Sequence, residues 1–370
     1  MGGGLKIGIA GAGLLGRLLA WQLCQQGHHV SVFDPAADAL PRFDGRGAAG
    51  FTAAGMLSPL AELDGASPQV AHLGLRSLLL WPRILATLPQ APFFAQKGSL
   101  LVAHPSDLGS ARRVLSRLEQ APAEMPRPLP LDPAHLQQLE PALHGVLHAW
   151  LLPGEGQIDP LGTLTALYEQ ACHEGVAWHW GTVVEQVKPG CLTLQGQGSA
   201  RYFDWVFDVR GLGARPPRLL PQASEVSDQP ALRGVRGEII WLHAPGHGLT
   251  RPIRLVHPRH RVYLVPRPQD TLVMGASEIE SEDRSPVSLR TALELMSAAY
   301  SIMPALAEAR ILRMDANLRP AHPDNEPSLH IEPGRVCING LFRHGWLLAP
   351  AIIDGALAKL PLHGFLPARK

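Results

Sequence analysis

Three glycines near the start of the chain have the spacing of a dinucleotide-binding turn. Gly11, Gly13 and Gly16 follow the pattern G-x-G-x-x-G. In such a turn the first glycine permits a tight bend, the second lets backbone N–H groups approach a pyrophosphate, and the third lets a helix pack closely on a strand. Asp34 is placed to accept hydrogen bonds from a ribose hydroxyl. These residues predict a dinucleotide site, and they do not by themselves distinguish NAD from FAD.

The residues around these glycines predict the strand, helix and strand that must position them. Residues 5–10 form a short apolar run typical of a buried parallel strand. Leu14 and Leu15 begin the apolar surface of a helix whose N-terminus attracts phosphate charge. Residues 29–33 predict a second strand that ends at Asp34. The whole unit, rather than the glycines alone, carries the prediction.

Further along the chain, turn and capping residues mark the other elements. Helices are predicted to begin at Ser67-Pro68, Asp159-Pro160 and Ser285-Pro286, with a closing helix from about Pro350. Residues 93–148 form an insertion with a proline-rich linker, and residues 233–277 alternate as an antiparallel sheet does. An apolar strand ends in Gly211 and Gly213, which form a second place where backbone could meet a cofactor.

Composition argues against several classes of function. The chain has 370 residues, with 33 basic and 32 acidic side chains that form no long block of one sign. This balance does not indicate a surface for nucleic acid or for anionic membranes, so the expected partners are small molecules or other copies of the chain. The four cysteines lie far apart and predict neither a zinc site nor a disulfide framework. Arg17 and the glycine pattern interrupt the apolar run at 5–24, so we expect no targeting or membrane segment and a cytoplasmic location.

Several motifs together resemble the D-amino acid oxidase superfamily of flavoproteins, and within it most of all the glycine oxidases of thiamine biosynthesis. The motifs are the N-terminal fingerprint, YLVPR at 263–267, NLRP at 317–320 and GLFRHGWLLAP at 340–350. The resemblance spans nearly the whole chain and implies an α/β protein of two domains. One is a Rossmann-like FAD-binding domain assembled from residues 1–92, 149–225 and 316–370. The other is a substrate domain built on an antiparallel sheet from residues 93–148 and 226–315.

The resemblance also implies FAD as the cofactor, bound without a covalent link because no cysteine lies in the motifs around Arg319 and Arg343. The implied contacts place the glycine turn at the pyrophosphate, Asp34 at the ribose, and Val183 or Val184 near the adenine. Two loops would border the flavin ring. The expected cofactor-binding residues are Gly11, Gly13, Leu14, Leu15, Gly16, Asp34, Ala53, Ala54, Gly55, Met56, Val183, Val184, Gly211, Gly213, Gly340, Phe342, Arg343, His344, Gly345, Trp346 and Leu347.

The reaction implied by the resemblance is oxidation of glycine or another small amino acid by hydride transfer from the α-carbon to flavin N5. The products would be a 2-oxo acid, ammonia and hydrogen peroxide, with oxygen as the electron acceptor. Arg319 is expected to bind the substrate carboxylate, because a planar guanidinium grips a carboxylate through two parallel bonds. Tyr263 would supply a phenol beside the substrate, and Arg343 would face either the flavin or the pocket.

Three residues depart from the glycine oxidase pattern. Arg261 stands where that pattern favours a histidine, Glu278 where an apolar residue would suit a small substrate, and Phe51 where a serine is usual. The two charges either select a larger polar amino acid or form a salt bridge with each other, and the salt bridge is the favoured interpretation. His257 and His260 are interpreted as loop histidines, and no metal site is expected, because no carboxylate or cysteine completes a ligand set nearby.

Two other hypotheses remain open on the sequence. One keeps FAD but passes electrons to a quinone or a protein, which makes the chain a D-amino acid dehydrogenase. The other is a non-catalytic FAD-binding subunit of a heteromeric amine oxidase, against which the presence of both Arg319 and Tyr263 argues. An NAD-linked dehydrogenase is the weakest alternative, because the later flavin-type loops would have no role in it.

Overall fold

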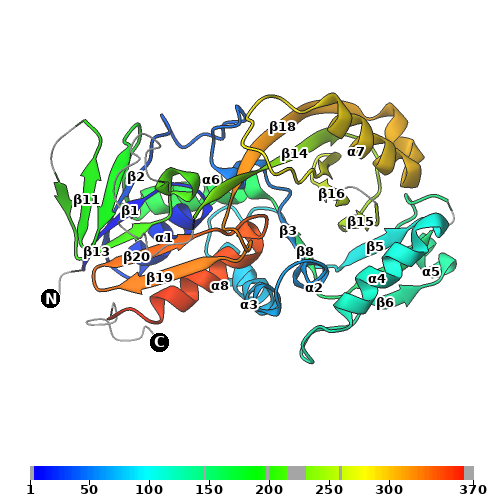
Figure 1. The fold of residues 1–370 in the computed structure, drawn as a ribbon, viewed down its shortest axis with the longest axis horizontal. Helices are drawn as coiled ribbons and strands as arrows, with labels where there is room; N and C mark the ends of the chain where they lie inside the picture. Colours follow the sequence, from blue (N-terminus) through cyan, green and yellow to red (C-terminus); the bar gives the residue numbers. More distant parts are fainter. Residues whose placement is uncertain (1–3, 146, 197–199, 216–230, 258–260, 362–370) are drawn as a thin grey trace.

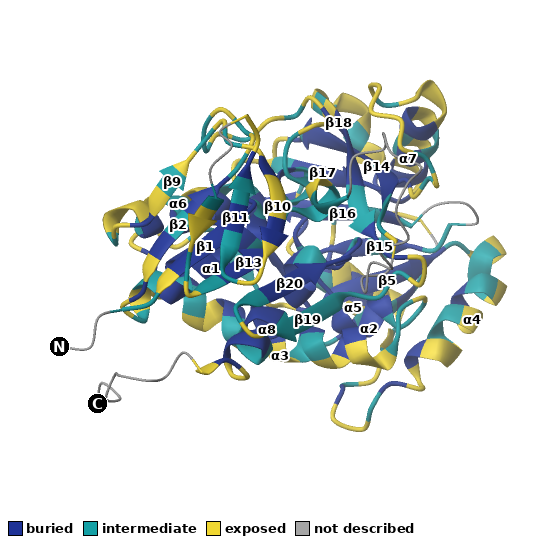
Figure 2. Ribbon diagram, turned by 60° about the vertical axis from the view of Figure 1, so that its left-hand side comes forward, coloured by how far each residue is buried: buried dark blue, intermediate teal, exposed yellow. Residues whose placement is uncertain are grey.

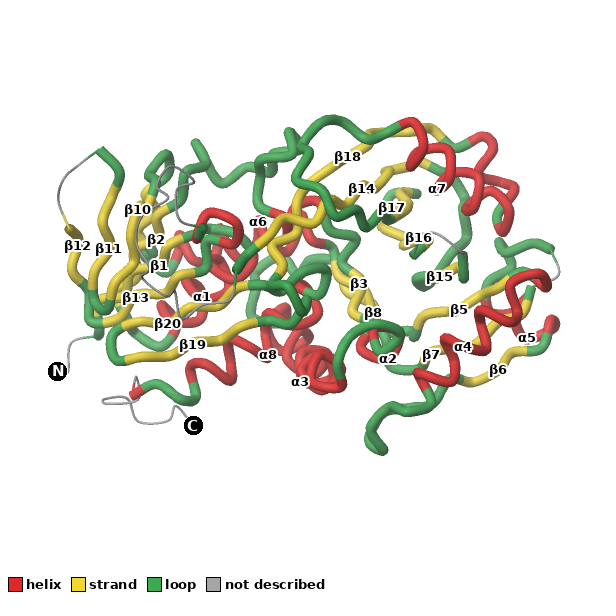
Figure 3. Tube along the Cα trace, viewed as in Figure 1, coloured by secondary structure: helices red, strands yellow, loops and turns green. Residues whose placement is uncertain are grey.

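The structure is a computed structural model that describes residues 4–145, 147–196, 200–215, 231–257 and 261–361. Two large sheets dominate it, one at each end of the molecule (Figure 1). In the ranges that the structure describes, no helix combines the length and the hydropathy that crossing a membrane requires. Figure 3 shows how loops connect the two sheets at the middle of the molecule.

The first sheet has six strands in the order β19-β20-β13-β1-β2-β9. All neighbours are parallel except β19 and β20. The strands are β1 (Lys6–Ala10), β2 (His29–Phe33), β9 (Ala177–His179), β13 (Trp205–Asp208), β19 (Ser328–Glu332) and β20 (Arg335–Asn339). The predicted strands at 5–10 and 29–33 are thereby confirmed.

Both faces of this sheet are covered, which explains why most side chains of its central strands are apolar. On one face lie α1 (Leu14–Gln25), α3 (Pro68–Leu85), α6 (Pro160–His173) and α8 (Gly345–Leu357), packed on Ile9, Val32 and Phe207. On the other face lies a three-stranded sheet of β10 (Val184–Lys188), β11 (Cys191–Leu194) and β12 (Ala200–Tyr202), packed on the alternate residues of β1, β2 and β13. Figure 2 shows β1, β13 and β20 as a buried layer.

The second sheet has eight strands in the order β18-β14-β17-β16-β15-β5-β7-β6. Its neighbours are antiparallel except β15 and β5. The strands are β5 (Ser99–Ala103), β6 (Leu129–Leu131), β7 (His148–Leu152), β14 (Arg233–His243), β15 (Ile253–Leu255), β16 (Val262–Arg267), β17 (Thr271–Gly275) and β18 (Arg310–Ala321). The sheet expected over residues 233–277 is therefore the centre of a larger one.

Side chains of this second sheet alternate between two cores. Ile240 and Leu242 of β14 pack with α7 (Leu289–Ile302) on the outer face. Ile239 and Trp241 pack on the inner face, toward the first sheet. The fold is completed by α2 (Pro59–Glu62), α4 (Leu108–Leu118) and α5 (Pro133–Leu139), by a small sheet of β3 (Met56–Leu57), β4 (Phe94–Ala95) and β8 (Gly156–Ile158), and by 3₁₀ turns at Ala49–Thr52, Pro105–Asp107, Gly211–Ala214 and Pro304–Glu308.

Two predicted helix starts are wrong. The helix expected at Ser285-Pro286 begins at Leu289, because Ser288 rather than Ser285 accepts the capping bond from Thr291 N, at 3.2 Å. The closing helix α8 begins at Gly345, so Pro350 lies inside it rather than at its start. A proline there leaves the carbonyl of Trp346 without its helical donor. The indole Nε1 of Trp81 donates to that carbonyl at 2.9 Å, which compensates for the missing bond.

Strands β7 and β18 run across the domain boundaries expected at 148/149 and 315/316. The exact division of the chain between its two domains therefore stays a prediction.

The cap of α6 generates a prediction about stability. Both carboxylate oxygens of Asp159 accept backbone bonds at 3.1 Å, from Leu161 N and Gly162 N. We expect Asp159→Ala to lower the free energy of unfolding by about 1–2 kcal/mol, measured by urea denaturation. Glu169→Ala, on the exposed side of the same helix, is the control and should change it by less than about 0.5 kcal/mol. Equal effects of the two substitutions would contradict this role.

Candidate active site

A cavity of about 850 Å³ lies between the two large sheets. Segments that follow the carboxyl ends of β1, β2 and β13 line one end of it, as is usual for nucleotide sites in parallel sheets. The inner face of the eight-stranded sheet lines the other end, with residues such as Ile239, Tyr263 and Arg319. We call these the nucleotide end and the substrate end, after the roles that the sequence predicts for them.

The three glycines of the fingerprint occupy different places at the nucleotide end. Gly11 has a φ of +106°, and a Cβ there would lie 2.7 Å from Val209 O. A Cβ on Gly16 would lie 1.9 Å from Gly11 O, so Gly16 lets α1 pack against the turn and does not itself line the cavity. Gly13 does line it, and its nearest neighbour, Ala48 Cβ, would be 3.5 Å away. The turn therefore keeps open space where a pyrophosphate would approach α1.

Asp34 lies at the end of β2 and lines the cavity. Its Oδ2 accepts a hydrogen bond from Ala12 N at 2.6 Å, and its Oδ1 accepts one from Ala36 N at 2.8 Å. These bonds fix the carboxylate beside the glycine turn. Val183 and Val184 also line this end, as does Arg17, whose guanidinium donates to three backbone carbonyls from the turn, α6 and the loop after β2.

Most of the other expected cofactor residues line the cavity as well. They are Leu14, Leu15, Ala53, Ala54, Gly55, Met56, Gly211, Gly213, Phe342, Arg343, Gly345 and Trp346. Gly340, His344 and Leu347 do not line it. A Cβ on Gly340 would lie 2.0 Å from His322 Cδ2, and Leu347 packs beside Gly74 of α3. These three residues lie behind the cavity wall, and Leu347 does so because α8 begins at Gly345 and its side chain faces α3.

Tyr263 belongs to a row of residues that crosses the eight-stranded sheet. In register, Arg254 of β15 pairs with Tyr263 of β16, which pairs with Gly275 of β17, which pairs with Ile239 of β14. Such partners project from the same face. A Cβ on Gly275 would lie 2.5 Å from Tyr263 Oη, so the phenol occupies the space that this glycine leaves. Burial raises the pKa of Tyr263, which keeps the hydroxyl protonated at neutral pH.

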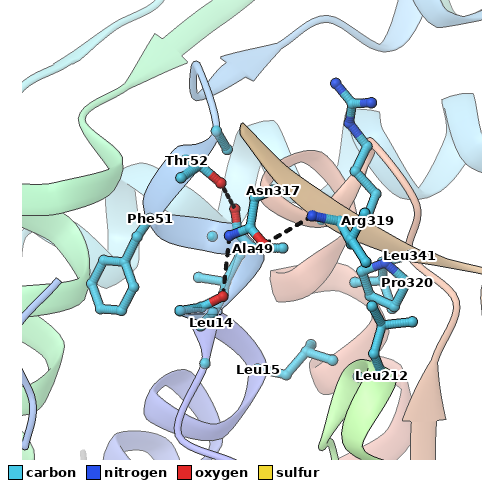
Figure 4. Close-up of a pocket in the computed structure, with 18 of the residues that line it drawn as sticks. Leu14, Leu15, Ala49, Phe51, Thr52, Leu212, Asn317, Arg319, Pro320 and Leu341 are labelled. Atoms are coloured by element: carbon cyan, nitrogen blue, oxygen red, sulfur yellow. Dashed lines mark hydrogen bonds between the residues drawn. The ribbon is translucent and has the colours of Figure 1, made fainter. Parts of the chain in front are cut away.

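Arg319 projects from β18 into the same region. Its Nη1 and Nη2 each donate to Ser277 O at 3.2 Å, and a Cβ on Gly237 would lie 2.2 Å from Nη2. In Figure 4 its guanidinium points away from Leu14 and Leu15 at the nucleotide end, while Asn317 of the same strand points toward them. Among the described residues, no carboxylate forms an ion pair with Arg319. The guanidinium is therefore a cation in a cavity wall whose protein partners are neutral carbonyls.

A buried glutamate that the sequence analysis missed lies beside these residues. Glu62, the last residue of α2, is 9% exposed. Its carboxylate lies 2.9 Å from Arg343 Nη2 and 3.0 Å from Arg254 Nη2. Burial alone would raise the pKa of Glu62, but the surrounding arginines hold it well below its usual range. The only local signal is a carboxylate inside the apolar run PLAEL, and its partners are distant in sequence.

His344 Nδ1 lies 3.4 Å from the same carboxylate, yet the contact is not an ion pair at neutral pH. Burial, together with Arg343, Arg261 and Arg254, lowers the pKa of His344 to about 4 in spite of Glu62. The imidazole is therefore neutral, and Glu62 is balanced by the arginines.

The salt bridge expected between Arg261 and Glu278 is wrong, because each residue has another partner. Arg261 Nη1 lies 3.4 Å from Asp64 Oδ2, and Glu278 Oε2 lies 3.0 Å from Arg343 Nη1. Both Arg261 and Glu278 line the cavity. Phe51 lies in the 3₁₀ turn Ala49–Thr52 and also lines it, with the Arg17 guanidinium 5.2 Å from its ring centroid.

Within the ranges that the structure describes, no group of three or more His, Cys, Asp or Glu side chains could hold a metal ion. His257 is in these ranges, whereas His260 lies outside the described residues.

The depressed pKa of His344 predicts a pH dependence of stability. Between pH 6.5 and about 4 the unfolded chain binds a proton at this residue that the folded chain does not. The free energy of unfolding should therefore fall as the pH is lowered through this window, by up to about 3 kcal/mol from this group. In His344→Gln that contribution is absent, so the decrease between pH 7 and pH 4.5, measured by urea denaturation, should be smaller than in the unaltered protein. Parallel pH profiles would contradict the prediction.

Comparison with known proteins identifies the family. The FAD dependent oxidoreductase (DAO) family matches residues 6–356. A Rhizobium etli protein named thiamine biosynthesis oxidoreductase ThiO is 34% identical over 368 residues, which cover 99% of each chain. Glycine oxidase of Geobacillus kaustophilus is 24% identical over 356 residues, 93% of this chain and 89% of that protein. Its crystal structure superposes with a TM-score of 0.80 at 23% identity, covering 99% of this chain and 96% of that chain. The crystal structure of iminodiacetate oxidase from Chelativorans has a TM-score of 0.76 at 22% identity, covering 98% and 99%.

These likenesses confirm the two-domain α/β fold, and the fingerprint, Asp34 and the long cavity fit the cofactor of that family. The chain belongs to the FAD-dependent oxidoreductases of the D-amino acid oxidase type, and within them it is similar to ThiO and glycine oxidase.

Proposed function

We propose that the chain is an oxidase of glycine or another small amino acid, which it converts to a 2-oxo acid, ammonia and hydrogen peroxide. When bound, FAD would supply the redox chemistry by accepting the hydride equivalent from the substrate α-carbon. The observation that carries the proposal is Arg319, a guanidinium in the cavity wall that contacts only neutral carbonyls of the described residues. Such a group calls for an anionic ligand, and an amino acid carries one beside its reacting carbon.

The neighbouring side chains fit the same substrate. The Tyr263 hydroxyl stays protonated and can donate a hydrogen bond to a carboxylate held by Arg319. Arg343 lines the same part of the cavity and is held in place by Glu62 and Glu278, whose carboxylates offset its charge. The protein's part is to hold the substrate at reacting distance and to exclude water, so an additional acid or base is not required.

FAD would extend along the cavity from Asp34 at the ribose to the segments 53–56 and 342–346 at the flavin ring. Val183 and Val184 would contact the adenine, and the N-terminus of α1 would face the pyrophosphate. None of the four cysteines lines the cavity, which supports non-covalent binding.

The test is an absorbance spectrum of the purified protein followed by anaerobic addition of glycine, sarcosine and both enantiomers of small amino acids. Bleaching of the flavin by one of them, and hydrogen peroxide on readmission of air, are the expected results. Bleaching without peroxide would indicate a dehydrogenase instead. A flavin that no amine reduces would contradict the proposal.

Replacing the carboxylate-binding group should weaken substrate binding. Arg319→Lys removes the two-pronged geometry but keeps the charge, so we expect kcat/KM for the reactive amino acid to fall about 100-fold, because hydrogen bonds between charged groups contribute about 1.5–3 kcal/mol. Steady-state peroxide formation measures this. Arg310→Lys, on the exposed end of the same strand, is the matched control. If both variants kept full activity, Arg319 would not be the carboxylate ligand.

Removing the carboxylate at the end of β2 should weaken the cofactor complex. We expect Asp34→Ala to raise the dissociation constant of FAD at least about tenfold, because it removes a ribose ligand and the bonds that shape the glycine turn. Titration of the apoprotein with FAD, followed by flavin fluorescence, measures this. Asp44→Ala, in the exposed loop that follows, should leave the affinity unchanged; a similar loss in both variants would contradict the assignment.

A further inference from the structure

The substrate end of the cavity carries more guanidinium groups than carboxylates. The charged side chains that line it are Arg254, Arg261, Arg319, Arg343, Glu62 and Glu278. A wall with this composition can accept more negative charge from a ligand than the single carboxylate of glycine supplies.

The ion pairs show which of these guanidinium groups is not already closely paired with a carboxylate. Glu62 is shared by Arg254 and Arg343, and Glu278 also pairs with Arg343. Arg319 is assigned to the α-carboxylate of the substrate. That leaves Arg261.

Arg261 is only loosely held. Among the described residues its ion-pair partner is Asp64, at 3.4 Å, and Asp64 does not line the cavity. Asp64 is held more closely by Arg117, whose Nη1 lies 2.9 Å from Oδ1 and also donates to the backbone oxygen at 2.8 Å. A ligand carboxylate could therefore engage Arg261 while Asp64 keeps its other partner.

The backbone places Arg261 beside the residues that surround the reacting carbon. It directly precedes β16, and its carbonyl accepts a bond from Ala276 N at 3.1 Å. Val262 packs in the outer core, whereas Arg261 and Tyr263 on either side of it both line the cavity, about 7 Å apart along the chain. The Arg261 side chain is 38% exposed, and a Cβ on Gly65 would lie 2.6 Å from its Nη2, so the absence of a side chain at 65 leaves room for the guanidinium.

We propose that the substrate is an amino acid with a second carboxylate, and that Arg261 binds this second carboxylate while Arg319 binds the first. This inference rests on the proposed function and narrows its substrate class to aminodicarboxylates such as aspartate. The reaction is the same: the amino acid, oxygen and water give the 2-oxo acid, ammonia and hydrogen peroxide. The α-carbon hydrogen leaves with its electron pair, and oxygen is the final electron acceptor. The second carboxylate takes no part in it except to hold the substrate.

Aspartate and asparagine are the probes that test the charge alone, since they have nearly the same shape. Both enantiomers of each, together with glycine, are added anaerobically to the flavin-loaded protein, and the rate of flavin reduction is measured against concentration. We expect the half-saturating concentration of the reactive enantiomer of aspartate to be at least tenfold below that of asparagine. Arg261→Met should make the half-saturating concentrations of aspartate and asparagine similar. Arg261→Lys should keep part of the preference for aspartate.

Asp64→Asn is the matched control, because it removes the protein carboxylate that pairs with Arg261 without altering the cavity wall. It should keep or strengthen the preference for aspartate; if it removes the preference as fully as Arg261→Met does, Arg261 acts by holding the loop at 63–66 and the inference is wrong. Reduction by glycine with no preference between aspartate and asparagine would overturn the inference and leave the proposed function standing. If no amino acid reduces the flavin, the proposed function fails, and the inference fails with it.

Discussion

The carboxylate of Glu62 lies buried between the guanidinium groups of Arg254 and Arg343, and this ion cluster joins parts of the chain that are far apart in sequence. Glu62 ends α2, Arg254 lies on β15 of the eight-stranded sheet, and Arg343 lies in the loop before α8. Burying a charge costs free energy unless an opposite charge pairs with it. Removing any one of the three side chains would therefore leave a buried charge without its full set of partners. The cluster therefore holds the eight-stranded sheet against α2 and against the loop before α8, at the wall of the cavity between the two large sheets.

Two glycines leave the space in which two side chains of the cavity wall lie. Gly275 leaves space for the phenol of Tyr263, and Gly237 leaves space for the guanidinium of Arg319. Both glycines belong to strands rather than flexible loops, so the groups above them are held by a hydrogen-bonded sheet. The nucleotide end uses the opposite arrangement, in which turns at the ends of parallel strands present backbone groups to the cavity. The cavity thus combines a rigid wall with a turn shaped for an anion.

The parts predicted well from the sequence are those whose signals are local. The strand, glycine turn, helix and strand at 5–34 lie where the pattern placed them, because each signal and its structural result lie within a few residues. The start of α8 was missed because the bond that makes Pro350 tolerable comes from Trp81 in another helix. Glu62 was missed for the same reason, since its partners lie in β15 and before α8. The partners of Arg261 and Glu278 were assigned wrongly because their actual partners, Asp64 and Arg343, are distant in sequence. No local sequence pattern shows that these segments lie close together in the fold.

A double-mutant cycle between Glu62 and Arg343 tests the central role of this ion cluster most directly. The free energy of unfolding is measured for the unaltered protein, for Glu62→Gln, for Arg343→Met and for the double variant. If the pair holds the two parts together, the double variant should be less destabilised than the sum of the single variants by at least about 1 kcal/mol, because the second substitution removes a charge that the first left unpaired. Additivity within about 0.5 kcal/mol would contradict the account, because it would mean that the two groups are not energetically coupled.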